Sequence, residues 1–419
     1  MSIGYACLNV GTPNTAMRSV IKRNATNEML TQVTQHNLEA LEKMIDYNIE
    51  NNIRLFRISS DLIPFGSSPV NQLAWWNIHH DTFQRIAAKV KKSNMRLSFH
   101  PGQYTVLNSP REDVVERAIL DLDYHSKVLD CLGSGYDHKI ILHVGGVYGD
   151  KEEAMARFAE NFQRLSSAVK KRLIIENDDR LYNIVDVLTL AETLGIPVVY
   201  DNLHHAINPP PEFGSDSQWI DQVKNTWKAE DGKQKIHYSQ QASKKRLGAH
   251  TQTINLETFL AFYEGLTDQS IDIMLEVKDK NISALKCVNA TEVDANISLL
   301  EKEWARYKYL VLEKSPADYE RIRTLLKDKA SYPVRAFYTL IENALAKEIQ
   351  VGQAENAALH IWGYFKGKAT SQEEKRFVKT LENYRNGSGT LATVKRHLLK
   401  LATKYQETYL LHSLYFYLE

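Results

Sequence analysis

Cysteine is scarce in this 419-residue chain, and long apolar runs are missing from it. The three cysteines lie far apart without a CxxC pair, which disfavours a disulfide scaffold and fits buried thiols in a reducing cytoplasm. No apolar run approaches the roughly 20 residues that a membrane-spanning helix needs. The first residues, MSIGYACLNVG, lack a basic segment followed by a long apolar one, so a secretory signal is not expected. These absences predict a cytoplasmic protein without a membrane partner.

Net charge is also small, because 52 Lys and Arg side chains face 51 Asp and Glu side chains. The total alone points to no polyanionic partner. Acidic residues exceed basic ones in the first 300 positions, and basic residues exceed acidic ones from Glu301 onward. This distribution would fit a protein whose first 300 residues hold metal through carboxylates and whose remaining residues contact phosphates. A solvated helical surface in the second part fits equally well and is the simpler interpretation.

Strand-like and helix-like segments alternate through the first 280 residues. Each short run rich in β-branched residues is followed by an amphipathic stretch long enough for a helix. Eight such repeats indicate an α/β fold of the TIM (β/α)₈ barrel type. A doubly wound open sheet is the alternative, but Asn9–Pro13 after the first run is no GxGxxG turn. The expected strands are Ser2–Asn9, Leu55–Ser59, Arg96–His100, Lys139–Val144, Leu173–Glu176, Pro197–Asp201, Lys235–Tyr238 and Asp272–Val277.

Helical periodicity defines the connecting segments and the end of the chain. Residues 301–419 are expected to form helices only, so we divide the chain into a barrel domain, 1–300, and an accessory helical domain of unknown role, 301–419. Helices expected within the barrel include Thr34–Glu50, Asn77–Lys92, Arg111–Leu132, Lys151–Lys170 and Tyr182–Leu194.

Ionisable residues stand at the carboxyl ends of six consecutive predicted strands. In a barrel these ends form one ring, where catalytic groups gather. Burying so many ionisable groups together costs several kcal/mol each unless cations neutralise them, so the ring implies metal. The strand-end residues are His100, His143, Glu176, Asp201, His237 and Glu276, and His204 and His250 lie close by in the sequence.

Eight nitrogen and oxygen ligands exceed the needs of one ion, which favours two or three divalent metals. Ligation without thiolate suits Zn²⁺, Mn²⁺ or Fe²⁺. Such a centre is typical of phosphoester hydrolysis, because it supplies hydroxide at neutral pH and stabilises the leaving oxygen. Lys235 lies two residues before His237 and should point into the same interior. It is either a phosphate-facing cation, an acidic bridge if it is carbamylated, or half of an ordinary ion pair. Glu176, Lys235 and His237 are the candidate catalytic residues.

Two loops could contact a nucleic acid. Gln103 and Tyr104 follow His100-Pro101-Gly102, so a tight turn would project an amide and an aromatic ring outward, where they could replace base pairing and stacking. The run Lys244, Lys245 and Arg246 lies just before His250, where a phosphate backbone would need cations. A solvated charge run is the alternative. Tyr5 and Asn9 come from the first strand of the same ring.

Seven segments together resemble the UV damage endonuclease family, which is related to endonuclease IV: SSDLIPFGS, SFHPGQY, ILHVGG, IIENDDR, YDNLHHAINP, QKIHYSQ…KKRLGAH and MLEVKDK. The match runs in order through nearly all of residues 1–290. It implies a TIM barrel with up to three divalent metals, most commonly Mn²⁺, with Zn²⁺, Co²⁺ or Mg²⁺ as alternatives. The implied activity is ATP-independent incision of double-stranded DNA immediately 5′ of cyclobutane pyrimidine dimers and 6-4 photoproducts, without a nucleotide cofactor, by a monomer.

The resemblance also implies roles for particular residues. The eight ring residues match the family's metal ligands, and Lys235 matches a lysine beside the metals. Gln103 and Tyr104 match the pair that probes the distorted duplex, with Tyr5 and Asn9 near the lesion pocket. One position departs from the pattern: this chain has Ser68 where many members have a histidine, which puts the third metal site in doubt.

Two other functions fit parts of the pattern. A sugar isomerase or epimerase also surrounds divalent metals with His, Asp and Glu, but it does not need the Gln103-Tyr104 loop or the Lys244–Arg246 run. A non-catalytic damage sensor, whose helical domain recruits a partner, would bind irradiated duplex without cutting it.

Overall fold

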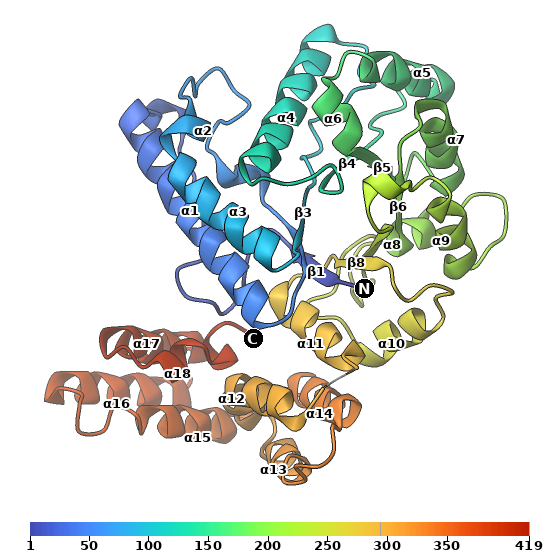
Figure 1. The fold of residues 1–419 in the computed structure, drawn as a ribbon. Coiled ribbons are helices and arrows are strands. Elements are labelled where there is room, and N and C mark those ends of the chain that lie inside the picture. Colours follow the sequence, from blue (N-terminus) through green and yellow to red (C-terminus); the bar gives the residue numbers. More distant parts are fainter. Residues whose placement is uncertain (294, 419) are drawn as a thin grey trace. The chain divides into compact units, whose positions relative to one another are not determined.

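The computed structural model describes residues 1–293 and 295–418. Its centre is a closed barrel of eight parallel strands, paired in chain order from β1 to β8, with β8 closing on β1 (Figure 1). The TIM-barrel prediction is therefore confirmed. The strands are β1 Ile3–Ala6, β2 Leu55–Arg57, β3 Arg96–Phe99, β4 Lys139–His143, β5 Leu173–Glu176, β6 Val198–Asp201, β7 Lys235–Tyr238 and β8 Asp272–Leu275.

Strand register brings the polar strand ends together. The strands are almost wholly buried, as expected for a parallel sheet covered by helices. His143 is paired with Glu176 across β4 and β5, and Asp201 with His237 across β6 and β7. Because neighbouring strands are in step at their carboxyl ends, the predicted ligands meet at one mouth of the barrel.

Helices cover the outside of the barrel, and two of the expected ones are each divided in two. The segment Asn77–Lys92 contains the end of α2, which begins at Trp75, and all of α3, and the two helices meet at His79. The segment Lys151–Lys170 breaks after Phe162, where Ser166 accepts a hydrogen bond from the Val169 N–H and starts α6. The helices of this part are α1 Asn27–Glu50, α2 Trp75–Ile78, α3 His80–Lys92, α4 Glu112–Cys131, α5 Lys151–Phe162, α6 Ser167–Arg172, α7 Ile184–Leu194, α8 Asn202–Ile207, α9 Asp216–Lys224, α10 Leu256–Glu264 and α11 Asn281–Thr291.

The chain divides into two compact units. The first comprises Met1–Asn9, Asn14–Ile254 and Thr258–Val288, and the second Val10–Pro13, Asn255–Glu257 and Asn289–Glu419. The second unit has its own core, in which the rings of Trp362 and Phe377 stack with centroids 4.4 Å apart. None of the helices among the described residues combines the length and apolar character needed to cross a bilayer. The helices that follow α11 are α12 Ile297–Lys314, α13 Pro316–Leu325, α14 Val334–Leu345, α15 Val351–Trp362, α16 Ser371–Arg385, α17 Leu391–Lys404 and α18 Thr408–Leu411.

Gly4 marks a close approach between β1 and β2. A methyl group at this position would lie 2.0 Å from the carbonyl oxygen of Leu55. We therefore expect Gly4→Ala to lower the free energy of unfolding of the barrel by about 3 kcal/mol, through forced separation of the two strands. Urea denaturation measures the change. Gly102→Ala is the control, because its added methyl meets nothing within 4 Å; equal stability of the two variants would contradict the prediction.

Candidate metal centre

The eight predicted ligands lie at the carboxyl ends of six strands and in the segments that follow them. His143, Glu176 and Asp201 are the last residues of β4, β5 and β6. His100 directly follows β3 and Glu276 directly follows β8, whereas His237 lies within β7. His204 is in α8, and His250 is held beside β7 by an antiparallel bridge to Gln241. The strand ends of the barrel thus supply six of the predicted ligands, and two short segments supply His204 and His250.

Glu176 is the centre of this group. One of its oxygens, Oε2, lies 3.0 Å from His100 Nε2 and 3.8 Å from His143 Nε2. The other, Oε1, lies 2.8 Å from His237 Nδ1 and 3.8 Å from His204 Nδ1. The two oxygens therefore face different imidazoles, which suits a carboxylate shared between two ions. Ligand atoms of two trios lie within 4.8 Å of one another: His100, Glu176 and His237, and Glu176, Asp201 and His204.

Glu276 extends the group to its other side. Its Oε1 lies 3.4 Å from His237 Nδ1, and its Oε2 lies 3.9 Å from His250 Nε2. Arg57 from β2 donates to Oε1 of the same carboxylate. This guanidinium holds the pKa of Glu276 below its usual range despite burial, so Glu276 is ionised and ready to bind a cation. The sequence reasoning missed Arg57, although a charged residue in the apolar run Leu55–Ser59 was the available signal.

Asp201 and His204 are positioned by the start of α8. Asp201 is the N-cap, and its Oδ1 accepts a hydrogen bond of 2.8 Å from the His204 N–H. The carbonyl of Asn177 lies 2.9 Å from His204 Nδ1, which orients the ring as an outer-shell partner of a metal ligand does. The side chain of Asn177 also bonds both backbone groups of Asp201. Asn177 is a second residue that sequence reasoning missed.

Several buried polar atoms of the ring and of the neighbouring Lys235 lack a hydrogen-bond partner within the described part of the chain. They are Asp201 Oδ2, His237 Nε2 and His143 Nδ1 of the ring, and Lys235 Nζ. Leaving one such group unsatisfied costs about 1–3 kcal/mol, and more if it is charged. Nitrogen and carboxylate oxygen donors without thiolate are a ligand set for divalent ions such as Zn²⁺ or Mn²⁺. The residues present therefore fit a divalent metal cluster.

The electrostatics of the ring point the same way. Burial alone would raise the pKa of Glu176, but His237, His143 and the hydrogen bonds from the imidazoles hold that pKa well below its usual range. Burial lowers the pKa of His100 to about 4, which keeps this imidazole neutral, as a metal ligand must be. Asp201 and Glu176 outweigh burial at His204 and raise its pKa to about 9. An ion in place of that proton would balance the same carboxylates.

Metal binding should therefore stabilise the fold. If an ion binds the native ring and not the unfolded chain, where the ring is lost, metal at about 100 times its dissociation constant should add about 2.7 kcal/mol to the free energy of unfolding. Thermal unfolding with Mn²⁺ and then with excess EDTA checks this. A melting temperature that is the same under both conditions would contradict it.

Lys235 lies in the barrel interior, on the same side of β7 as His237. Its side chain is fully buried, and burial together with the nearby Arg96 holds its pKa well below the ordinary lysine value. Asp272 is paired with it in the β7–β8 register, but no hydrogen bond to Lys235 Nζ forms within the described residues. The ion-pair alternative is thus not what the structure contains.

The predicted probing loop is exposed at the mouth. Tyr104 is 84% exposed, and Gln103 is exposed beside it. A pocket of about 480 Å³ is lined by Gln103, Tyr104 and the ring residue His143. Tyr5, in contrast, is fully buried: its hydroxyl donates to Asn9 Oδ1 and lies 2.7 Å from Asn48 Oδ1. Tyr5 therefore cannot touch DNA in this structure and instead positions Asn9.

The remaining predicted positions are on loops. Lys244, Lys245 and Arg246 are exposed, and none of the three forms an ion pair with a described acidic residue. Ser68 lies between η2 (Ser60–Leu62) and α2, where its hydroxyl accepts from the Val70 N–H at 3.3 Å. It belongs to neither ligand trio.

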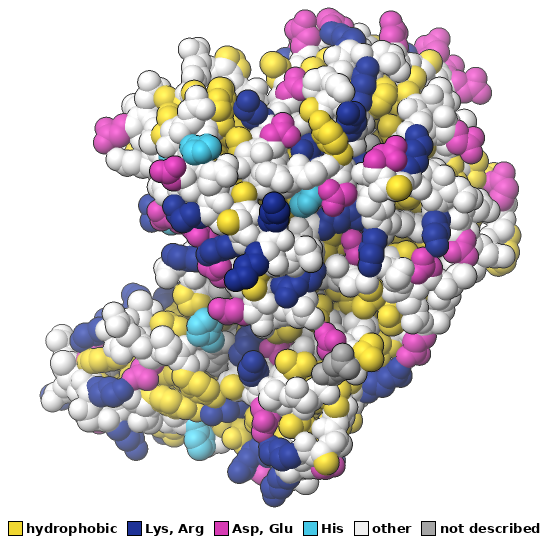
Figure 2. All heavy atoms as spheres, viewed as in Figure 1, with side chains coloured by type: hydrophobic (Ala, Val, Ile, Leu, Met, Phe, Trp, Pro, Cys, Tyr) yellow, Lys and Arg dark blue, Asp and Glu magenta, His cyan; other side chains and the backbone are white. Residues whose placement is uncertain are grey.

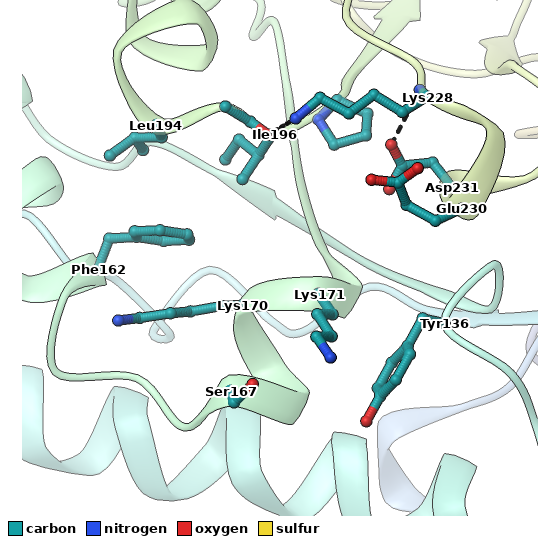
Figure 3. A pocket seen from close by; sticks show the side chains of 12 residues that line it. Tyr136, Phe162, Ser167, Lys170, Lys171, Leu194, Ile196, Lys228, Glu230 and Asp231 are labelled. Atoms are coloured by element: carbon teal, nitrogen blue, oxygen red, sulfur yellow. Dashed lines mark hydrogen bonds between the residues drawn. The ribbon is translucent and has the colours of Figure 1, made fainter.

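A second cavity lies away from this centre. Figure 3 shows a pocket of about 600 Å³ between Phe162 and Lys170 on one side and Ile196 and Lys228 on the other. Pro197 and Asp231 also line it, just before β6 and β7 begin. It therefore opens at the amino ends of the strands, opposite the ligand ring, and takes no part in that site.

Comparison with known proteins decides the family. A family model described as UV-endonuclease UvdE matches residues 1–304. The chain belongs to the UV-endonuclease UvdE family. It is 37% identical over 389 residues to the UV DNA damage endonuclease of Clostridium perfringens (strain 13 / Type A), covering 91% of this chain and 92% of that protein. It is 33% identical over 270 residues to the one of Bacillus thuringiensis subsp. konkukian (strain 97-27), covering 64% and 84%.

The chain is similar to the crystal structure of SacUVDE, with a TM-score of 0.66 and 40% identity over 69% of this chain and 97% of that one. A second family model, a protein of unknown function (DUF1722), matches residues 308–418. The alignment with the Clostridium protein is longer than the UvdE match, so that relative shares sequence beyond the barrel. The chain thus joins a UvdE barrel to a helical unit without an assigned role.

Proposed function

We propose that this protein is a divalent-metal-dependent endonuclease that hydrolyses the DNA phosphodiester immediately 5′ of cyclobutane pyrimidine dimers and 6-4 photoproducts, without ATP. Family membership supports the nuclease class. The observation that carries the metal dependence is Glu176, whose two oxygens face four imidazoles beside buried atoms that have no described partner. Bacterial relatives support placing this activity in the cytoplasm, with the chromosomal DNA.

The eight ring residues would hold two or three ions, Mn²⁺ first among the candidates and Zn²⁺, Co²⁺ or Mg²⁺ after it. Such ions supply a nucleophile from water at neutral pH and neutralise the leaving oxygen. The chain itself orients the site: Arg57 fixes Glu276, and Asn177 fixes Asp201 and His204. At the third metal site, water or the Ser68 hydroxyl would take the place of the histidine that many members of the family have.

Lesion choice would rest on deformability. A photoproduct weakens stacking, so extruding the damaged dinucleotide costs less than the few kcal/mol that normal duplex requires. Gln103 and Tyr104 are exposed beside the pocket that His143 lines, so they can occupy the space that the extruded bases leave. Asn9, held by the buried Tyr5, would line the lesion pocket, and the Lys244–Arg246 run would contact phosphates.

The double variant Gln103→Ala/Tyr104→Ala tests this role. We expect kcat/KM on a duplex with one thymine dimer to fall roughly 100-fold, because stacking is worth about 1–3 kcal/mol per base and the amide bonds are lost as well. Both side chains are exposed, so the melting temperature should not change. Tyr136→Ala, another exposed tyrosine, is the control. Wild-type kinetics in the double variant would contradict the assignment.

Incision of a labelled duplex with one thymine dimer, compared with its undamaged twin, tests the function itself. One cut directly 5′ of the dimer with Mn²⁺, lost with EDTA, is the expected result. Binding of the damaged duplex without a cut at saturating Mn²⁺ would instead favour the damage-sensor function. Absence of both binding and cutting would favour sugar chemistry.

A further inference from the structure

The helical unit contains a surface, formed by α16 and α17, on which exposed cations outnumber exposed carboxylates. Helices α16 and α17 lie side by side and run antiparallel (Figure 1). Lys404 Nζ lies 2.6 Å from Glu373 Oε1, and the rings of Phe377 and His397 stack at 6.5 Å. These contacts bring Lys379 level with Arg396, and Lys375 with Lys400, because each helix rises about 1.5 Å per residue.

Cations outnumber carboxylates on the exposed sides of the two helices, where α16 exposes the acidic residues Glu374 and Glu382. Phe377 and Leu381 of α16, and Leu398 of α17, point into the core. The cations lie on the opposite faces and are exposed; they are Lys375, Arg376, Lys379, Arg396 and Lys400. We call these five residues the α16–α17 cationic face. Within the described residues none of the five forms an ion pair, whereas Lys329, Lys347, Lys368, Arg385 and Lys404 of the same unit each pair with a carboxylate.

We propose that the α16–α17 cationic face binds the phosphate backbone of duplex DNA without reading its sequence. Five exposed cations against two exposed carboxylates leave this surface positive, and a positive cluster suits a polyanion. Over the upper right of the barrel in Figure 2, by contrast, dark blue and magenta side chains are interspersed. The uncharged neighbours Gln372, Asn383 and Thr393 are exposed and can donate hydrogen bonds to phosphates. A membrane-binding helix would present a broad apolar face beside its cations, whereas Val378, 45% exposed, is a single large apolar side chain on the exposed side of α16. DNA as the partner of this chain rests on the proposed function.

The test uses the full chain and an undamaged duplex. Lys379→Gln/Arg396→Gln/Lys400→Gln should weaken binding roughly tenfold or more and reduce the slope of log K against log salt by about 2.7, at about 0.9 per lost phosphate contact. The control Lys91→Gln/Lys302→Gln/Lys327→Gln removes equal charge from exposed positions elsewhere. On damaged duplex the test variant should raise KM and leave kcat unchanged.

An unchanged slope, or an equal loss in the control, would overturn the proposal. So would wild-type DNA binding combined with weaker binding to vesicles rich in phosphatidylserine. Failure of the proposed function is a separate outcome, because the slope on undamaged duplex is measured whether or not the wild-type protein cuts.

A second, independent observation concerns the tip of the loop between β7 and α10. The Gln241 side chain spans this loop: its amide donates 3.0 Å bonds to the carbonyls of Ala242 and Arg246, and its oxygen accepts from the Gly248 N–H. The Ala242 N–H donates to the Ala249 carbonyl across the loop. Leu247, at the tip, is nevertheless 72% exposed. A well-bonded loop thus presents an apolar side chain to water between cations and the ring residue His250.

We infer that Leu247 inserts between bases at the damaged step, as apolar wedges do in kinked DNA. The three cations that precede it would hold the backbone on either side. This inference deepens the proposed function and depends on it.

We expect Leu247→Ser to lower kcat/KM at least tenfold on a fully paired duplex that contains the dimer. On a duplex in which the dimer lies in an unpaired bubble, no opening is needed, and the variant should cut at the wild-type rate. Leu120→Ser, another leucine 53% exposed, is the control. Equal activity on both substrates, or equal loss on both, would overturn the inference. A wild-type protein that cuts neither substrate would overturn the proposed function instead.

Discussion

Glu176→Gln is expected to abolish incision while leaving the barrel folded. An amide keeps the shape of the side chain, but it removes the negative charge that four imidazoles face. A metal centre contributes several kcal/mol to transition-state stabilisation, and loss of about 4 kcal/mol corresponds to roughly 10³-fold in rate. We therefore expect a loss of that size or larger on a duplex carrying one thymine dimer.

Unfolding measurements separate this loss from misfolding. Without metal, the variant and the wild-type protein should have similar circular dichroism and melting temperatures, because the amide can still bond to His100 and His237. Added Mn²⁺ should raise the melting temperature of the wild-type protein and have little effect on the variant. Incision at the wild-type rate would show that Glu176 is not part of the catalytic site. Loss of the fold would show that its role is structural.

Strand positions were predictable because apolar runs recur with helix-length spacers, and parallel strands then place their carboxyl ends at one mouth. The predicted segment Leu173–Glu176 agrees with β5 at both ends. Helix breaks were harder to predict. Lys151–Lys170 has continuous helical periodicity, and the break depends on whether Ser166 caps a new helix or stays within one.

The grouping of the predicted ligands at one mouth of the barrel was likewise predictable, whereas the contacts that orient their side chains were not. A strand end indicates which side chains reach the mouth, but not what holds them there. Arg57 is on β2 and Glu276 follows β8, on either side of β1, and Asn177 acts through both its carbonyl and its side chain, so neither set of contacts follows from spacing. Tyr5 was expected near the lesion and is instead buried against Asn48. In a strand of only four residues, the alternation of side chains between the two faces was too short to show whether Tyr5 is buried or exposed.

Lys235→Met is the second large effect that we expect, and it should separate stability from activity. The lysine side chain is fully buried, and its amine has no hydrogen-bond partner among the described residues. An unbranched apolar side chain in its place removes an unsatisfied polar group, so in EDTA the free energy of unfolding should stay the same or rise by about 1 kcal/mol. Incision should nevertheless fall roughly 100-fold or more, if the amine, carbamylated or not, serves the metal centre.

Lys139→Met is the matched control, because Lys139 is also a buried lysine at the start of a barrel strand. Its amine donates to the buried carboxylate of Asp231 and to the Lys171 carbonyl. Removing the amine leaves the buried carboxylate of Asp231 without its positive partner, so the free energy of unfolding of this variant should fall by about 3 kcal/mol. Incision per folded molecule should stay at the wild-type rate. We therefore expect opposite results for the two variants. Lys235→Met should be stable and inactive, whereas Lys139→Met should be less stable and active. A Lys235→Met protein that cuts normally would place Lys235 among the structural residues of the interior.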